Sequence, residues 1–406
     1  MPARWTDAQL DRLRTVADEP ADRAVRAFFN ASPDSAQWNR LHALLDSFVS
    51  DSAAPPPGLP PELIDYLTTT ARVPPPSLPR ISAGEALFAD LGPEILLVLG
   101  CYSLPAAYAA AKGAQVLCRT EFLERAAQLR LFQTAQMIVD VMSPGGLGPR
   151  GTGIRAAQKV RLLHASIRHL IRTDASNPWN ADLLGVPINQ EDLAGTLMTF
   201  TLVVLDGLAK LDITVPREQQ EAYYDAWRAV ASLMGLVDEL IPATLEEARE
   251  LMTVIHRRQI AASPEGVRLT QSLLQALSEG PFAAEAAGAP ASWLSRLANG
   301  AIEHEMKQIS SVLMRHMLDG QADRNGTPVA DLLQLPPAPM FSEFLLDVAL
   351  RIGAAIEHDL NDTAHRRRVL RWFNIRLIDW MLTRQLGAGR SLFSVPDSLY
   401  ASWKHT

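Results

Sequence analysis

One histidine and two arginines in a single segment have the types and spacing that cofactor chemistry requires. His164 lies near the middle of the stretch from Ile154 to Arg172, and on a helix Arg161 and Arg168 would lie one turn to either side of it. The other residues of that face are apolar: Ala157, Val160, Ile167 and Ile171. An imidazole can supply an axial nitrogen to haem iron, apolar walls can shield the porphyrin, and guanidinium groups can pair with its propionates. The face therefore has the composition of a haem-binding surface.

The same pattern is also typical of a histidine that is satisfied within a helical core. Lone histidines on apolar helix faces and arginines at their edges are common in proteins that bind no cofactor. From this helix alone, both interpretations stand. The glycine-rich segment Pro144–Gly153 leads into the helix, but it lacks the GK[ST] ending and the preceding strand of a phosphate-binding loop.

The composition indicates a globular protein and excludes several classes. With 406 residues, 48% hydrophobic and 20% charged, the chain can bury the core of one large or two ordinary domains. A formal net charge of −7 gives no basic surface for nucleic acid. Cys101 and Cys118 form no disulfide framework and no CxxCH motif, so a haem would be held non-covalently.

Two apolar runs raise the question of a membrane. Ile95–Ala111 and Leu193–Ala209 are each about 17 residues long, at the lower edge for a membrane span. Pro105 interrupts the first and Asp206 the second, so we interpret both as buried helices and expect no stable membrane insertion. The N-terminal residues have no apolar core region, which predicts a cytoplasmic protein without a secretory signal. The oligomeric state has no signal in the sequence.

Helical periodicity dominates the chain and predicts an all-α fold. The proline-rich stretch 51–80 predicts a boundary between an N-terminal part, 1–80, with two or three helices and a wrapping segment, and a main helical domain, 81–406. The main domain is expected to have helices over 83–117 (broken near Gly92–Pro93), 119–143 (capped by Thr120), 154–172, 191–210, 217–236, 245–259, 266–277, 291–297, 301–317, 341–356 and 363–386.

A second segment carries polar residues at helical spacing. Arg130, Gln133 and Thr134 share one face of the helix predicted before the glycine-rich segment. The chain resembles the DUF2236 family, which includes the latex clearing proteins and the MpaB-type oxygenases. The resemblance is carried by these three residues, by Arg161-x-x-His164-x-x-x-Arg168-His169 and by the segment PINQEDLAGTLMTFTLVVLDGL. The resemblance covers roughly residues 85–260.

The resemblance implies a globin-like helical core around haem b, with additional N- and C-terminal helices. It implies His164 as the proximal iron ligand and makes Arg161 and Arg168 candidates for pairing with the propionates. His169 would support the structure. Arg130, Gln133 and Thr134 would line the distal pocket, where dioxygen or peroxide is activated.

The expected function is that of a haem-dependent oxygenase acting on an apolar small molecule such as an alkene or isoprenoid. Two alternatives stay open: a peroxidase-like or non-oxygenating haem enzyme, and a haem-based sensor or carrier.

Two positions depart from the family pattern. The distal lysine of the family is Gln133 here, and a neutral amide is a poor iron ligand, so a five-coordinate or water-bound iron is expected. The family's distal acid falls at Gly113 or Ala114, which carry no carboxylate. Rubber is therefore not implied as the substrate.

Overall fold

The chain forms an all-α fold, as predicted. The computed structural model describes residues 4–31, 59–71, 78–119, 127–148, 151–286, 307–337 and 364–386. Within these ranges there is no strand, and the β-type pairings are two isolated bridges, Ala110 with Ile260 and Ala322 with Pro328.

The helices have the following bounds: α1 Asp7–Leu13, α2 Glu19–Ala31, α4 Pro61–Thr69, α5 Leu78–Val98, a π-helical turn Leu99–Ser103, α6 Leu104–Tyr108, α7 Ala111–Arg119, α9 Ala127–Met142, α10 Gly153–Thr173, α11 Ala181–Leu184, α12 Gln190–Phe200, α13 Leu202–Lys210, α14 Arg217–Leu233, a 3₁₀ turn Asp238–Leu240, α15 Leu245–Gln259, α16 Pro264–Ala286, α18 Val329–Leu332 and α20 Ala364–Leu386. Residues 307–318 are also helical.

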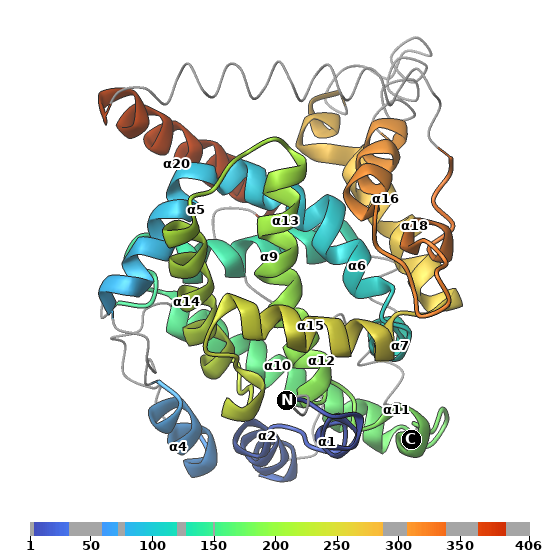
Figure 1. The fold of residues 1–406 in the computed structure, drawn as a ribbon. Coiled ribbons are helices and arrows are strands. Elements are labelled where there is room, and N and C mark those ends of the chain that lie inside the picture. Colours follow the sequence, from blue (N-terminus) through green and yellow to red (C-terminus); the bar gives the residue numbers. More distant parts are fainter. Residues whose placement is uncertain are drawn as a thin grey trace.

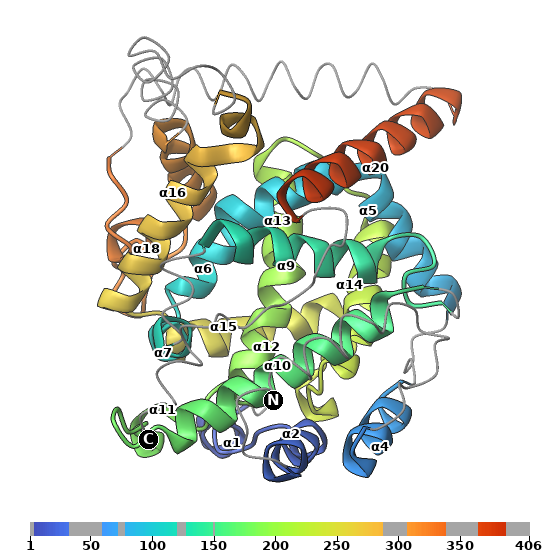
Figure 2. The ribbon, with the colours of Figure 1, turned by 180° about the vertical axis from the view of Figure 1, so that it is seen from behind.

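Helices from distant parts of the sequence surround a central layer. In Figures 1 and 2, α1, α2 and α4 lie at one end of the molecule and α20 at the other, with α9, α10 and α12 between them. The α5 and α14 helices pack closely because Gly84 has no side chain: a Cβ atom there would collide with the carbonyl oxygen of Ala222.

Two predicted helices are each divided in the structure. The helix expected over 83–117 kinks at Leu91, whose φ of −122° and ψ of 24° are non-helical, just before Pro93, and then passes through the π-helical turn into α6 and α7. A proline ring clashes with the preceding helical turn, so the break near Gly92–Pro93 is confirmed. The helix expected over 191–210 divides at Thr201 into α12 and α13. Thr120 and the helices predicted over 291–297 and 341–356 fall outside the described residues.

Two described helical stretches are long and apolar enough to cross a membrane by composition. They are Pro79–Tyr108 and Gln190–Lys210, and 67% and 61% of their most apolar windows are buried inside the structure. This burial agrees with the interpretation that both belong to the protein core.

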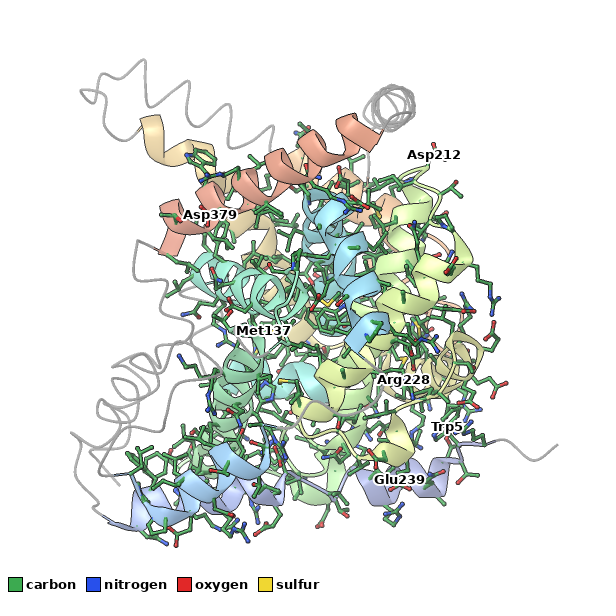
Figure 3. The ribbon with its side chains drawn as sticks, turned by 90° about the vertical axis from the view of Figure 1, so that its left-hand side faces the viewer. Trp5, Met137, Asp212, Arg228, Glu239 and Asp379 are labelled. Carbon is green, nitrogen blue, oxygen red and sulfur yellow. The ribbon has the colours of Figure 1, made fainter. Side chains whose placement is uncertain are left out.

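The N-terminal helices join two different clusters of apolar side chains. Trp5, Leu10 and Leu13 belong to the main core. Trp5 also donates its indole N–H to the carbonyl oxygen of Glu239 at 3.0 Å, and these two residues are labelled side by side in Figure 3. A smaller cluster joins α2 and α4 to Leu162 and Ala165 of α10. The domain boundary near residue 80 stays a prediction.

Buried ion pairs fasten α10 to the segment around α2. The guanidinium of Arg161 forms two hydrogen bonds with the Asp18 carboxylate, one of them 2.6 Å long. Nε of Arg168 donates to Oδ1 of Asp22 at 2.8 Å. Both pairs are almost completely removed from solvent, so they fix the position and rotation of α10.

The buried pair of Arg168 and Asp22 should be important for stability, and the chain offers an exposed ion pair for comparison. The Arg168 and Asp22 side chains are 2% and 8% exposed, whereas Arg23 and Asp65, which also pair, are 56% and 52% exposed. We expect Asp22→Ala to lower the free energy of unfolding by about 3–5 kcal/mol, because it leaves a buried guanidinium without its counter-charge. Asp65→Ala should lower it by less than about 1 kcal/mol. Chemical denaturation of both variants measures the difference, and equal losses would contradict this role.

Candidate functional site

A cavity of about 320 Å³ lies between α6, α7, α9, α10, α12 and α15. Its volume is at the lower end of the range for small-molecule pockets, about 300–1,000 Å³. Most of the side chains that line it are apolar, and a few polar ones come from separate helices.

One face of α10 forms part of the cavity wall. Val160, Leu163, His164 and Ile167 line it, and their spacing of three and four residues places them along one stripe of the helix. The imidazole of His164 is enclosed by protein but keeps some surface exposed to the cavity. Within the described part of the chain, its ring nitrogens have no hydrogen-bond partner.

The surroundings keep the His164 ring neutral. Burial, together with the positive charges of Arg168 and Arg130, lowers the pKa of His164 to about 3. A neutral imidazole has a lone pair on one ring nitrogen, which is the form that binds a metal ion. The site therefore offers a nitrogen ligand at neutral pH.

The glycine-rich turn before α10 is held by Glu85 of α5. The Gly145 N–H donates to a carboxylate oxygen of Glu85 at 2.9 Å, and the same carboxylate accepts from Gly146 and Leu147. Burial raises the pKa of Glu85, and these backbone bonds oppose the rise. The Gly153 N–H also bonds the Gly146 carbonyl at 2.9 Å, which fixes where α10 begins.

Helix α9 supplies a second wall. Arg130, Thr134 and Met137 line the cavity at spacings of four and three residues, so two of the three residues predicted for this helix are brought to the site. Figure 3 labels Met137 within the packed side chains of the interior. Burial lowers the pKa of Arg130, and nearby Tyr108 partly opposes this. The cavity wall therefore contains a half-buried cation.

The third residue predicted for α9 lies elsewhere. Gln133 is 1% exposed but is not among the residues that line the cavity, and its amide oxygen has no hydrogen-bond partner in the described structure. The expectation that Gln133 faces the site with Arg130 and Thr134 is therefore not supported. Met137, one turn further along α9, lines the cavity with Arg130 and Thr134.

The two arginines beside His164 are also placed differently from the prediction. Arg161 and Arg168 do not line the cavity, because their guanidinium groups turn to the carboxylates of Asp18 and Asp22. Pairing of these arginines with propionates has no support in this geometry. Arg130 is the guanidinium that lines the cavity.

His169 lies apart from the cavity, as expected from its position on the helix. Its ring stacks on Phe29 of α2, with centroids 5.0 Å apart and planes 7° from parallel. This contact supports the packing of α2 on α10.

Several polar residues in the wall were not predicted. Glu191 and Asp192 lie at the start of α12; Nη1 of Arg14 is 3.0 Å from Asp192, and Nε of Arg258 is 2.7 Å from Glu191. Gly113 lies beside them, and a Cβ atom there would be 3.9 Å from Oδ1 of Asp192. A carboxylate thus reaches this wall from α12 and not from position 113.

A further group comes from α15 and the segment after residues 307–318. His256, Gln259 and Gln321 line the cavity. His256 and Gln259 are three residues apart in a predicted helix, so the sequence indicated that they share a helix face. It did not indicate that this face lines the cavity. Gln321 has no signal in the sequence.

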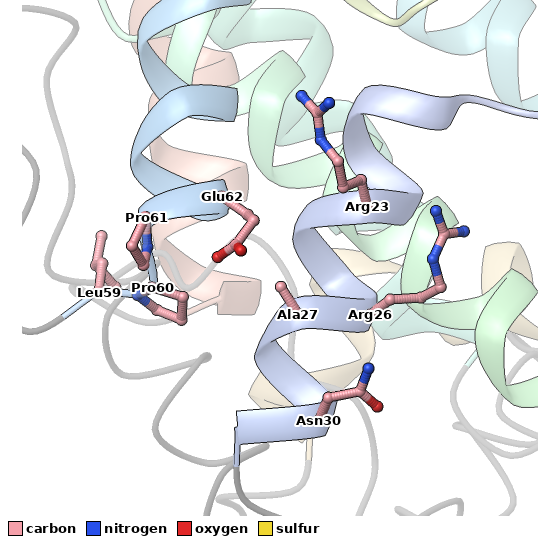
Figure 4. A pocket seen from close by; sticks show the side chains of 8 residues that line it. All are labelled: Arg23, Arg26, Ala27, Asn30, Leu59, Pro60, Pro61 and Glu62. Carbon is pink, nitrogen blue, oxygen red and sulfur yellow. The ribbon is translucent and has the colours of Figure 1, made fainter.

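A second depression lies between α2 and α4 (Figure 4). Arg23, Arg26 and Glu62 contribute its charged groups, and it contains none of the predicted site residues. We therefore assign the candidate site to the cavity beside His164.

Three comparisons with known proteins bear on the family of this chain. Residues 82–356 match the family described as "ER-bound oxygenase mpaB/B'/Rubber oxygenase, catalytic domain". The rubber oxygenase of Streptomyces sp. (strain K30) is 27% identical over 274 residues, which span 65% of this chain and 64% of that protein. A structure of latex clearing protein in the closed state superposes with a TM-score of 0.66 at 22% identity, covering 89% of this chain and 91% of the other.

These findings differ in what they establish. The likeness to the latex clearing protein structure supports the helical fold. The family match covers more than half of the chain and includes α9, α10, α12 and α15, the helices that form most of the cavity. The chain therefore belongs to the MpaB and rubber oxygenase family.

Proposed function

We propose that the protein is a haem-dependent oxygenase that acts on an apolar small molecule. The observation that carries this proposal is the imidazole of His164, which is neutral, has no hydrogen-bond partner in the described structure and lines an apolar cavity. Membership of an oxygenase family supports the reaction class.

The residues of the cavity fit haem b. A neutral histidine can ligate iron, and Val160, Leu163 and Ile167 beside it can cover a porphyrin face. Arg130 supplies a cation in the same cavity for an anionic propionate or for a polarised oxygen atom. The iron of bound haem supplies the activation of dioxygen or peroxide.

The protein would contribute positioning and polarity to this reaction. His164 would hold its side of the cofactor, because the ion pairs behind α10 prevent the helix from rotating. Arg130 would donate hydrogen bonds at the wall formed by α9. The hydroxyl of Thr134 already donates to the carbonyl oxygen of Arg130 at 2.9 Å, so Thr134 would mainly shape that wall. The apolar lining would exclude water and admit an alkene.

Removal of the proposed ligand tests the cofactor assignment. We expect His164→Ala to lose the Soret absorption of the purified protein and its haem content, because the substitution removes the proposed axial nitrogen. His169→Ala is the matched control, since its ring stacks on Phe29 outside the cavity, and it should retain its haem. Full haem content in His164→Ala would refute the assignment.

Arg130 and Gln133 of α9 allow a test of the reaction site, because only Arg130 lines the cavity. Arg130→Leu should lower alkene-dependent oxygen uptake by about 100-fold while haem content is retained, because it removes a hydrogen-bond donor from the cavity wall beside the reacting groups. Gln133→Leu should leave uptake nearly unchanged, since that side chain does not line the cavity. The reverse pattern would contradict the site as described. Turnover driven by peroxide, with no oxygen uptake, would favour a peroxidase-like reaction instead.

A further inference from the structure

The cavity contains a polar group of side chains on an otherwise apolar helix face. Met252, Ile255 and Ile260 line the cavity next to His256 and Gln259, which are one turn apart on α15. The reaction proposed above uses neither polar residue. Buried polar groups require hydrogen-bond partners, so their presence is informative about what the cavity holds.

A chain of hydrogen bonds leads from the carboxylate of Asp206 through Tyr102 to the side chain of Gln321. The hydroxyl of Tyr102 donates to Oδ2 of Asp206 at 2.7 Å, because an ionised carboxylate can only accept. Burial, and after it the charge of Asp206, raises the pKa of Tyr102, which keeps the phenol protonated. The Tyr102 oxygen therefore accepts from Nε2 of Gln321 at 3.0 Å.

This arrangement sets the orientation of the Gln321 amide. The Gln321 side chain also hydrogen-bonds His256, and its amide can offer that ring either its carbonyl oxygen or its second N–H. The backbone of Gln321 is also fixed, since its N–H donates to the Leu318 carbonyl at 3.0 Å and its carbonyl accepts from Val329 at 2.9 Å.

We assign His256 the tautomer that donates to the carbonyl oxygen of Gln321. Burial lowers the pKa of His256, while the bond to Gln321 opposes the change, so the ring is neutral at neutral pH. A neutral ring that donates from one nitrogen has a lone pair on the other. In the described part of the chain that second nitrogen has no partner. The cavity wall therefore offers a fixed hydrogen-bond acceptor.

The amide of Gln259 adds a hydrogen-bond donor and an acceptor beside His256. The side chain is buried, at 5% exposure, and neither its amide oxygen nor its nitrogen has a hydrogen-bond partner in the described structure. Leaving both groups unpaired is unfavourable, whereas a ligand group that both donates and accepts would satisfy one amide atom and the free nitrogen of His256.

We infer that His256 and Gln259 form a subsite for the hydroxyl group of a long-chain unsaturated alcohol. The hydroxyl hydrogen would be donated to the free nitrogen of His256, and its oxygen would accept from the amide of Gln259. An ether or ester oxygen accepts only and cannot satisfy His256, and an ammonium group would bury a charge without a free counter-charge. Glu191 and Asp192, the nearby carboxylates, are already paired with Arg14 and Arg258.

This inference rests on the proposed function only in assuming that the cavity is the substrate pocket. It names the substrate class as an alkene that carries a hydroxyl group. A pure hydrocarbon would leave the acceptor on His256 and the amide of Gln259 unpaired.

The test compares three ligands of one carbon skeleton on the full-length protein as purified. Isothermal titration calorimetry would give the affinities of farnesol, its methyl ether and farnesene. We expect farnesol to bind about tenfold more tightly than the ether or the hydrocarbon, the effect of one well-formed hydrogen bond. His256→Leu should reduce the farnesol affinity to that of the ether and leave the ether affinity unchanged.

Met252→Leu is the matched control, because Met252 lies one turn before His256 on the same cavity face, and it should keep the preference. Equal affinities of the three ligands for the unmodified protein, binding of none of them, or a preference that survives in His256→Leu would overturn the inference. The ligand comparison needs no variant, so a folding defect in His256→Leu cannot obscure it. Absence of the preference in the unmodified protein, when that protein binds haem and takes up oxygen, would refute this subsite alone. Retained haem in His164→Ala would refute the oxygenase proposal and leave the calorimetry unaffected.

Discussion

The structure depends on the way α10 is fixed from behind by buried ion pairs. Asp18 and Asp22 hold Arg161 and Arg168, and Tyr66 of α4 donates its hydroxyl to the carbonyl oxygen of Gln158 at 2.9 Å. These bonds are far from water, so they resist exchange and fix the rotation of the helix. The stripe of α10 that contains His164 can then face an apolar cavity, with no hydrogen-bond partner for the imidazole in the described structure. The neutral histidine on that stripe is exposed to the cavity because the charged residues of the same helix are committed elsewhere.

The sequence was sufficient for the helices and for the position of His164 on an apolar helix face, because both depend on local pattern. The helix predicted over 154–172 is observed as Gly153–Thr173, and the one predicted over 245–259 is observed with those bounds. His164 was recognised by its apolar neighbours at helical spacing, and two of them, Val160 and Ile167, line the cavity. A break near Gly92–Pro93 followed from the geometry of proline.

The sequence was not sufficient for the partners of the charged residues. Arg161 and Arg168 are one turn from His164, but a helical pattern cannot show that two aspartates nearly 150 positions earlier would reach them. Gln133 shares a predicted face with Arg130, yet packing turns it away from the cavity. Gln321 lies in a loop, where no periodic pattern applies, and its role depends on contacts with Tyr102 and His256. The residues that define the polar side of the cavity therefore emerge only from the tertiary structure.

The central claim is that His164 holds haem iron in this cavity. The most direct measurement is the absorption spectrum of the purified full-length protein, as isolated, after reduction and after addition of carbon monoxide. The account predicts a Soret band that shifts on addition of carbon monoxide, because His164 is the one iron ligand that we propose and the other side of the iron would stay accessible. Absence of a Soret band, even after incubation with hemin, would contradict it.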